Sequence, residues 1–309
     1  MSAELHIERL PVERLLVAGC GSLGTRIALL AATRGATVFG LRRHAAQLRA
    51  PIEPIAGDLV RGDFAVPAAL DAVVLSVAPG PEARAAKTPQ ERAAVYEQTY
   101  LASARGLVDA LRRAHARPRR IVFTSSTGVY GADDGSAVDE DTPPQPSEAT
   151  GRVLLATEEL LANSGFPATA LRLGGIYGPG RTRLVEQVLN GEAHYGVAPP
   201  RFTNRIHVDD AAAAVVHLLE LADAPAVVCG VDDACVTEGE VLVWLARRLG
   251  ALEPRPLPGR SPHGGGKRVS NARLRASGFN FAYPTYRDGY EALIAELGDG
   301  PFTLRSRTR

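Results

Sequence analysis

Residues 15–24 read LLVAGCGSLG and decide the fold class. The apolar run at 15–18 predicts a short buried strand, and the pattern of 23–33 predicts a helix. Between them stand three glycines in the spacing GxGxxG, which permits a tight turn and a close backbone approach to a ligand. The unpaired N–H groups at the start of such a helix attract a pyrophosphate, whereas the same glycines in isolation would indicate only a turn. We therefore expect a dinucleotide to contact Gly19, Gly21, Ser22, Leu23 and Gly24.

Apolar runs and helical patterns go on alternating after this stretch. Further strands are expected at 36–41, 52–56, 72–77, 120–125 and 168–173, and further helices at 89–115, 150–163, 209–221 and 237–249. Runs that are almost continuously apolar are typical of parallel strands covered on both faces. The expected fold class is therefore α/β, a Rossmann doubly wound parallel sheet with helices on both faces and a smaller C-terminal substrate-binding part.

The strict alternation weakens after Gly180, which suggests a division of the chain. We expect residues 1–175 to form the NAD(P)-binding domain and residues 176–309 to be mostly substrate-binding, with about 205–230 returning to the first domain. The acidic, proline-containing segment 131–150 and the Pro- and Gly-rich segment 253–266 are predicted to be loops. The tail after Gly298 has little to pack and is expected to be disordered.

Composition restricts the kinds of partner. The chain has 309 residues, 45% of them hydrophobic, and a formal net charge of +1, whereas proteins that bind nucleic acid or membrane surfaces usually carry a strong basic excess. Three cysteines, Cys20, Cys229 and Cys235, fit neither a disulfide framework nor a zinc site. The start of the chain lacks the apolar core of a signal peptide, and no apolar run is long enough to span a bilayer. We expect a cytoplasmic protein that acts on a small molecule, without a metal, nucleic acid or membrane partner.

Two arginines, Arg42 and Arg43, end the second predicted strand. An NAD-binding fold usually places Asp or Glu at this point to hold the ribose 2′-hydroxyl. A carboxylate would repel a 2′-phosphate, whereas paired guanidinium groups can hydrogen-bond it. The sequence therefore favours NADP(H), with NAD(H) as the alternative. A solvated pair of charges at a strand end is the simpler interpretation of the same residues.

The ends of the next two strands add further candidates for the cofactor site. Parallel strands bring their carboxyl ends to one edge of the sheet, where open α/β proteins bind ligands. The side chain of Asp58 could meet the adenine amino group, or it could cap an ordinary turn. The expected contacts at this edge are Asp58, Leu59, Val77, Ala78 and Pro79.

Four motifs, taken in order, resemble a known family. They are GCGSLG at 19–24, FTSSTGVYG at 123–131, LRLGGIYGPG, which spans 171–180, and RIHVDD at 205–210. Together they resemble the extended short-chain dehydrogenase/reductase superfamily, which contains the NAD(P)-dependent epimerases and dehydratases. The resemblance covers most of the chain and extends the expected cofactor contacts to Leu173, Gly174 and Gly175.

The resemblance also implies catalytic residues. Family members use a Ser or Thr at the position of Ser126 to hydrogen-bond the substrate carbonyl or hydroxyl. They carry a Tyr, and a Lys four residues later, on the helix after the acidic loop, where the Tyr moves a proton and the ammonium lowers its pKa. Here Thr150 and Leu154 align with that pair, and no Tyr occurs between Gly131 and Ile176. The chain therefore resembles an atypical branch that lacks the YxxxK motif.

Other residues could supply the missing proton donor. Tyr130 and Tyr177 lie in turns near the expected site, and either phenol could take this role, although a packed aromatic is the simpler interpretation of each. His207 precedes two aspartates at a helix start, which favours a structural hydrogen bond. Thr203 stands where nucleotide-sugar enzymes of the superfamily have an Arg for the substrate phosphate, although Arg201 and Arg205 are nearby. A nucleotide-sugar substrate therefore remains an alternative that the sequence does not indicate.

Two functions remain open from the sequence. The first is an NADP(H)-dependent oxidoreductase or epimerase that acts on a small carbonyl or alcohol through Ser126. The second is a non-catalytic NADP(H)-binding protein, for example a redox sensor, because loss of a proton donor costs several orders of magnitude in rate. The resemblance further implies a homodimer formed through the helices at 89–115 and 150–163. Residues 267–273 and 283–286 resemble a C-terminal element that closes the substrate pocket.

Overall fold

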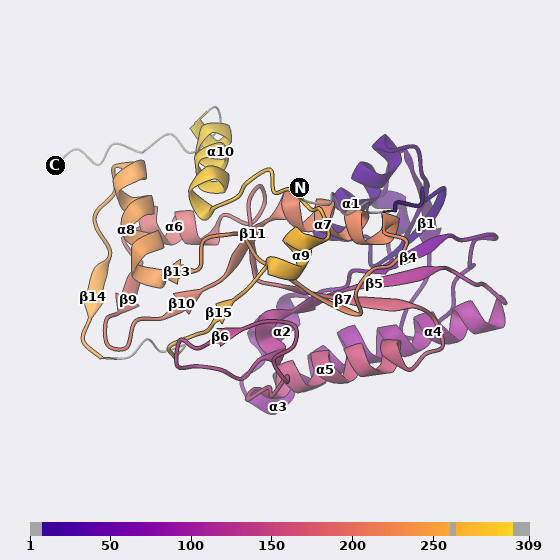
Figure 1. Ribbon diagram of the computed structural model, residues 1–309, viewed down its shortest axis with the longest axis horizontal. Coiled ribbons are helices and arrows are strands. Elements are labelled where there is room, and N and C mark those ends of the chain that lie inside the picture. Colours follow the sequence, from indigo (N-terminus) through magenta and orange to yellow (C-terminus); the bar gives the residue numbers. More distant parts are fainter. Residues whose placement is uncertain (1–7, 260–263, 299–309) are drawn as a thin grey trace, which may run out of the picture.

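A seven-stranded parallel sheet forms the centre of the protein (Figure 1). The computed structural model describes residues 8–259 and 264–298. The strand order is β12-β7-β5-β4-β1-β2-β3, the doubly wound order in which the chain reverses direction between β1 and β4. The strands are β1 (Arg14–Ala18), β2 (Thr37–Arg42), β3 (Ile52–Ala56), β4 (Ala72–Leu75), β5 (Arg120–Ser126), β7 (Ala168–Leu173) and β12 (Val227–Gly230).

Helices cover both faces of this sheet, and each face has its own apolar core (Figure 1). One face carries α1 (Ser22–Thr33) and α7 (Val208–Glu220). The other carries α3 (Pro89–Tyr96), the π-helical turn η2 (Glu97–Ala102), α4 (Ser103–Arg113) and α5 (Ala149–Ala162). Short helical segments η1 (Ala45–Gln47), α2 (Pro81–Ala85) and η3 (Thr127–Val129) follow β2, β4 and β5. The expected α/β class and doubly wound parallel sheet are confirmed.

The C-terminal part packs around a third apolar core, built on α6 (Arg183–Leu189), α8 (Glu238–Leu249) and α10 (Tyr286–Gly298). The strands outside the central sheet are short and pair in twos. They are β6 (Ala137–Val138) with β15 (Arg268–Val269), β8 (Gly175–Tyr177) with β11 (Arg205–His207), β9 (His194–Gly196) with β14 (Arg255–Leu257), and β10 (Phe202–Thr203) with β13 (Val236–Thr237). The helix α9 (Ala272–Ala276) packs against β12.

Several predicted boundaries differ from the structure. The helix expected over 89–115 is divided by η2, whose π-helical turn apolar periodicity does not reveal. The two predicted loops, 131–150 and 253–266, each contribute a short strand, β6 and β14, which pairs with a distant segment. The strand expected over 72–77 ends at Leu75. The tail after Gly298 lies outside the described residues.

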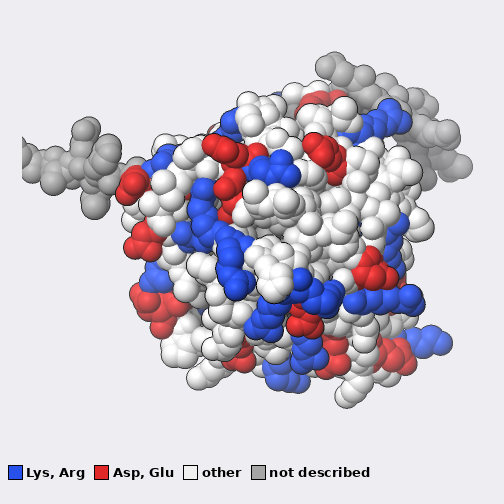
Figure 2. Space-filling model, turned by 90° about the vertical axis from the view of Figure 1, so that its right-hand side faces the viewer, with Lys and Arg blue, Asp and Glu red and all other residues white. Residues whose placement is uncertain are grey.

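Charges of both signs share the surface. On the face shown in Figure 2, which is the right-hand end of Figure 1, basic and acidic side chains are interspersed. This distribution accords with the formal net charge of +1. In the described part of the chain, no helix is long and apolar enough to cross a membrane.

Candidate cofactor groove and active site

A groove of about 960 Å³ runs along the carboxyl ends of β1, β2, β4, β5 and β7. It lies where the chain reverses direction in the sheet, the place at which open α/β folds bind ligands. The structure brings most of the predicted cofactor residues to it. Those that line the groove are Gly19, Gly21, Ser22, Leu23, Arg42, Arg43, Asp58, Leu59, Val77, Ala78, Leu173 and Gly174.

The glycine turn after β1 has the geometry that the motif predicts. Gly19 has φ +88°, and a Cβ there would stand 2.6 Å from the carbonyl oxygen of Ser76. A Cβ on Gly24 would stand 2.5 Å from the carbonyl oxygen of Gly19, so this glycine lets α1 pack against the turn. Gly24 itself does not line the groove. Its contribution is to the shape of the turn.

The first turn of α1 is free to bind an anion. The helix begins after Gly21 without a side-chain cap, and its first turn holds no acidic residue. A Cβ on Gly21 would meet no atom within 4 Å, so the groove is open at this point. Free N–H groups and the helix dipole favour a phosphate here. The residues present therefore fit the pyrophosphate of a dinucleotide.

Arg42 and Arg43 mark one end of the groove. Arg42 is the last residue of β2, and Arg43 follows it with an exposed side chain. Neither guanidinium has an ion pair within residues 8–259 and 264–298. The neighbouring His44 also lines the groove. Two unpaired guanidinium groups thus stand where a carboxylate would serve the ribose of NAD(H).

Asp58 lines the groove and also closes a turn. Its Oδ1 accepts a hydrogen bond of 2.9 Å from the N–H of Val60, and its own N–H donates to Asp63. The turn interpretation of Asp58 therefore holds, and its side chain lines the ligand site as well. Pro79 and Gly175 were predicted as contacts, but neither is among the residues that line the groove. A Cβ on Gly175 would lie 3.4 Å from the carbonyl oxygen of Asn204, the residue before β11.

Ser126 is the candidate catalytic residue that the structure places in the groove. It is the last residue of β5, and its side chain is half-buried. Its Oγ accepts a hydrogen bond of 3.1 Å from the N–H of Gly128, which fixes the turn η3. The hydroxyl hydrogen stays available to donate to a substrate oxygen.

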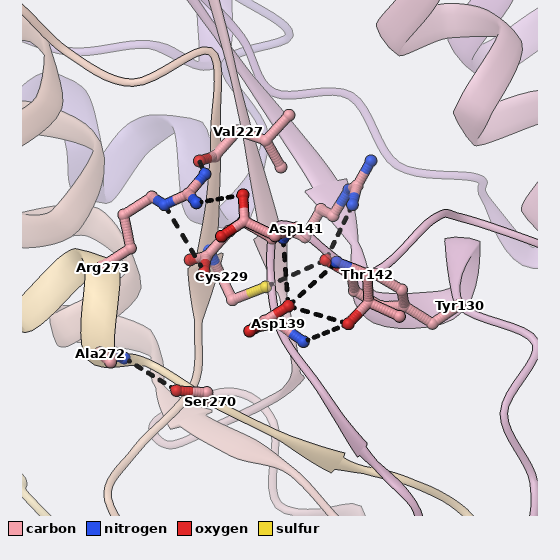
Figure 3. A network of polar contacts seen from close by, with 11 residues as sticks. Tyr130, Asp139, Asp141, Thr142, Val227, Cys229, Ser270, Ala272 and Arg273 are labelled. Atoms are coloured by element: carbon pink, nitrogen blue, oxygen red, sulfur yellow. Dashed lines mark hydrogen bonds and ion pairs between the residues drawn. The ribbon is translucent and has the colours of Figure 1, made fainter.

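Tyr130 is committed to a buried network outside the groove. Its hydroxyl accepts a hydrogen bond of 2.8 Å from Arg172 and lies 3.4 Å from the Sγ of Cys229 (Figure 3). Arg172 forms a buried ion pair with Glu158, and Glu158 also accepts from Ser125. Burial and the Cys229 hydrogen bond raise the pKa of Tyr130. This position gives no support to Tyr130 as the proton donor.

The same region ties the acidic loop to the C-terminal part (Figure 3). Asp139 accepts hydrogen bonds from Asp141 and Thr142, and Arg273 pairs with Asp141 at 2.7 Å. The N–H of Cys229, on β12, donates to Glu140. Polar contacts with β12 and with Arg273 therefore fix the loop at 131–150.

Tyr177 is also buried away from the groove. Its ring stacks on that of Tyr290 with centroids 4.3 Å apart and meets the ring of His207 edge-on. Its hydroxyl is buried without a hydrogen-bond partner in the described chain, and burial raises its pKa. His207 caps α7 by accepting from the N–H of Asp209, as its structural interpretation requires. Tyr177 thus packs the junction between β8 and α10.

The helix α5 supplies no proton donor. Leu154, which aligns with the family Lys, is 4% exposed and belongs to the apolar core. Thr150, which aligns with the Tyr, does not line the groove. The segments 267–273 and 283–286, expected to close a substrate pocket, also lie outside the groove. In the first of them, the ammonium group of Lys267 donates to the carbonyl oxygen of Tyr130.

The groove contains residues that the sequence did not single out. Among them are Tyr100 on η2, Ser103 at the start of α4, and Arg181 after β8. The sequence held one signal for Arg181, its place directly after the motif YGPG. It held none for Tyr100, because periodicity over 89–115 does not indicate which side of the helix meets the sheet edge.

Known proteins resemble this chain in sequence. The model of the NAD dependent epimerase/dehydratase family matches residues 15–230. Protein YeeZ of Escherichia coli K12 is 30% identical over 288 residues, which cover 88% of this chain and 97% of that protein. The 3-diazoavenalumate denitrifying reductase of a Streptomyces species is 32% identical over 206 residues, which cover 59% of this chain and 67% of that protein.

Solved structures share the fold. A protein of Methylobacillus flagellatus, described as an NAD-dependent epimerase/dehydratase, is 34% identical, with a TM-score of 0.75 over 93% of this chain and 100% of that one. The UDP-glucose 4-epimerase of Thermus thermophilus in complex with NAD has a TM-score of 0.75 at 21% identity, covering 93% of this chain and 100% of that one. The second likeness concerns the fold alone.

Proposed function

Because this chain belongs to the NAD dependent epimerase/dehydratase family and is an NAD(P)-dependent enzyme of the oxidoreductase or epimerase kind, we propose that it uses NADP(H) to reduce or oxidise a small carbonyl or alcohol. The observation that carries the cofactor choice is the unpaired Arg42 and Arg43 at the end of β2, in the groove that holds the glycine turn. A 2′-phosphate would satisfy both guanidinium groups.

The chain's own residues supply binding and orientation. The glycine turn and the first turn of α1 would hold the pyrophosphate, and the two arginines would hold the 2′-phosphate. When bound, the cofactor supplies or accepts a hydride. Ser126 lines the same groove at the end of β5, where its hydroxyl can donate to the oxygen of a carbonyl or alcohol. That hydrogen bond orients the substrate and polarises its C–O bond.

The contacts that Arg201 and Arg205 make within the protein favour a small substrate over a nucleotide sugar. Arg205 is buried and donates to the hydroxyl of Thr203 at 2.5 Å. Arg201 pairs with Glu238 at 3.0 Å. Both guanidinium groups are engaged within the protein, in the region where relatives with nucleotide-sugar substrates would need a free cation for the phosphate. The relative from Streptomyces, whose name is that of a reductase, supports a reductive reaction.

Calorimetric titration tests the cofactor part of this proposal. NADPH and NADH are titrated into the wild type and into the Arg42→Ala/Arg43→Ala variant. We expect NADPH to bind the wild type at least about tenfold more tightly than NADH, or about 1.4 kcal/mol, and the variant to lose this preference. The exposed Arg247, which pairs with Glu253 far from the groove, gives the control Arg247→Ala. Equal affinity of the wild type for both cofactors would contradict the choice of NADP(H).

A carbonyl screen tests the chemical part. NADPH consumption is followed with 4-nitrobenzaldehyde, ethyl pyruvate and cyclohexanone, and Ser126→Ala is the matched variant. We expect turnover of at least one carbonyl by the wild type and a loss of about 10²-fold or more in Ser126→Ala, since a positioned donor contributes on this scale. Binding of NADPH without turnover of any carbonyl would instead favour the redox-sensor alternative.

A further inference from the structure

The groove lacks the Tyr and Lys of the family but contains another phenol. Tyr100 lines it together with Ser126, whereas Tyr130 and Tyr177 are buried elsewhere. The Tyr100 side chain comes from η2 and packs against the apolar core on the sheet face opposite α1. Its ring meets the ring of Phe123 edge-on, with centroids 6.1 Å apart. Phe123 lies on β5 three residues before Ser126, so this contact anchors the phenol beside the strand that carries the serine.

The phenol reaches the groove from a π-helical turn. A π-helical turn inserts a residue into a helix and rotates the side chains that follow, and such turns are frequent at functional sites. In η2 the hydroxyl of Thr99 donates to the carbonyl oxygen of Val95 at 2.8 Å, and Thr99 and Tyr100 both line the groove. The preceding Tyr96 packs against Tyr100 with ring centroids 5.3 Å apart but does not line the groove.

A cation lines the same groove as this phenol. Arg181 follows the YGPG turn, where its N–H donates to the carbonyl oxygen of Gly178 at 2.8 Å, and its side chain lines the groove. Its Nε is buried without a hydrogen-bond partner in the described chain. Burial and Tyr96 raise the pKa of Tyr100, and the charge of Arg181 lowers it. The phenol is thus protonated at neutral pH, and the guanidinium would stabilise the phenolate once a proton has left.

We propose that Tyr100 is the proton donor of this active site and that Arg181 replaces the missing lysine as the cation that supports it. The inference rests on the proposed reduction of a carbonyl. Tyr100 gives its hydroxyl proton to the carbonyl oxygen while a hydride from NADPH adds to the carbonyl carbon. The C=O π bond breaks, a C–H and an O–H bond form, the carbonyl is reduced to an alcohol and NADPH is oxidised to NADP⁺. The Tyr100 phenolate then takes a proton from water in the groove.

The first test needs neither substrate nor cofactor. The residue 2,3,5-trifluorotyrosine, a more acidic phenol, is placed at position 100, and its ionisation is followed by ¹⁹F NMR in the protein with Arg181 and in the Arg181→Met variant. We expect the methionine variant to raise the pKa of this phenol by about one pH unit or more, because an adjacent opposite charge is removed. A pKa that Arg181→Met leaves unchanged would overturn the pairing of the two residues.

The second test is kinetic, with the carbonyl from the screen that the wild type reduces fastest. We expect Tyr100→Phe to lower kcat by about 10²-fold or more, the scale of a lost general acid, with KM and the Kd of NADPH within about threefold of the wild type. Tyr96→Phe is the matched control, since it removes a hydroxyl from the same ring pair outside the groove. It should keep the wild-type kcat.

The outcomes separate the two proposals. If the wild type turns over a carbonyl and Tyr100→Phe keeps its kcat, the role of Tyr100 is wrong while the proposed function stands. If Tyr100→Phe loses NADPH affinity in proportion to its rate, its role is structural and the inference is likewise wrong. If the wild type binds NADPH and reduces no carbonyl, the proposed function fails, and with it the role of Tyr100.

Discussion

Arg172 and Glu158 form an ion pair of 2.7 Å in which the two side chains are only 4% and 7% exposed. Arg172 lies on β7 and Glu158 on α5, so the pair joins the helix to the sheet directly behind the groove. Burial lowers the pKa of Arg172, but the hydrogen bond and the charge of Glu158 outweigh it and raise this pKa. Glu158 also accepts a hydrogen bond of 2.5 Å from Ser125, the neighbour of Ser126.

We expect Glu158→Gln to lower the free energy of unfolding by about 3–5 kcal/mol, because it leaves the buried charge of Arg172 unpaired. Urea denaturation of the variant and the wild type measures this difference. The exposed pair of Arg247 and Glu253 gives the control, and Glu253→Gln should change stability by less than about 1 kcal/mol. A similar small effect for Glu158→Gln would mean that the buried pair does not hold the helix to the sheet.

Two glycines of the turn after β1, Gly19 and Gly21, should respond differently to substitution by alanine. Gly19→Ala forces a Cβ to within 2.6 Å of a backbone carbonyl at φ +88°, so it should destabilise the fold by about 2 kcal/mol or more. Gly21→Ala adds a Cβ in open space, so we expect wild-type stability to within about 1 kcal/mol but NADPH binding weakened at least about tenfold, because the methyl group occupies the phosphate site. Thermal unfolding and calorimetry check the two effects. Unchanged NADPH affinity in Gly21→Ala would place the pyrophosphate elsewhere.

Removal of the buried hydroxyl groups of Tyr130 and Tyr177 should change stability in opposite directions. The Tyr177 hydroxyl is buried without a partner in the described chain, so Tyr177→Phe should leave stability unchanged or raise it by up to about 2 kcal/mol. The Tyr130 hydroxyl accepts from Arg172, so Tyr130→Phe should cost about 1–3 kcal/mol. Neither variant should lower kcat. Loss of kcat in either one, at full stability, would restore that tyrosine as the candidate proton donor.

Asp232 should make stability depend on pH. It is 4% exposed, its Oδ2 lacks a hydrogen-bond partner in the described chain, and burial raises its pKa to about 7. Between the ordinary pKa of an aspartate and about pH 7, the folded state therefore holds a proton that the unfolded state has lost. Asp232 thus lowers the free energy of unfolding progressively as pH rises through this window, by roughly 2–4 kcal/mol in total.

The variant Asp232→Asn isolates this effect. Urea denaturation between pH 4 and 8 should show a flatter dependence on pH in Asp232→Asn, with its gain over the wild type largest above about pH 7. Parallel curves for the two proteins would show that this carboxylate titrates alike in the folded and unfolded states.

Six of the seven strands of the sheet could be predicted from sequence because they are short runs bounded by turns, whereas β12 was not among the expected strands. The bounds of β3 and β7, at Ile52–Ala56 and Ala168–Leu173, match the predicted ranges. Pairs such as β6 with β15 could not be predicted, since strands of two residues carry no periodic signal and their partners lie more than 100 residues away. Their register depends on tertiary packing.

The candidate site likewise contains residues that the sequence could locate and residues that it could not. The glycine turn, Arg42 and Arg43 could be located from sequence because they lie at or directly after the end of a strand, and Ser126 could be located from the family resemblance. The sequence placed Tyr130 and Tyr177 in turns and did not determine the direction of either side chain; Tyr130 follows η3, Tyr177 ends β8, and both phenols are buried. Tyr100 lies on a π-helical turn that apolar periodicity does not reveal, so its position in the groove becomes visible only in three dimensions.

The edge strand β12 has a consequence for how the protein is made. It pairs with β7, although more than 50 residues of the C-terminal part separate the two strands in the chain. During synthesis on a ribosome, six strands of the sheet emerge before β12, and β7 presents an open edge until about residue 230 has left the exit tunnel. An unpaired edge of this kind is a template for wrong pairing. We therefore expect truncation before residue 227 to yield aggregated chains rather than a shorter folded enzyme.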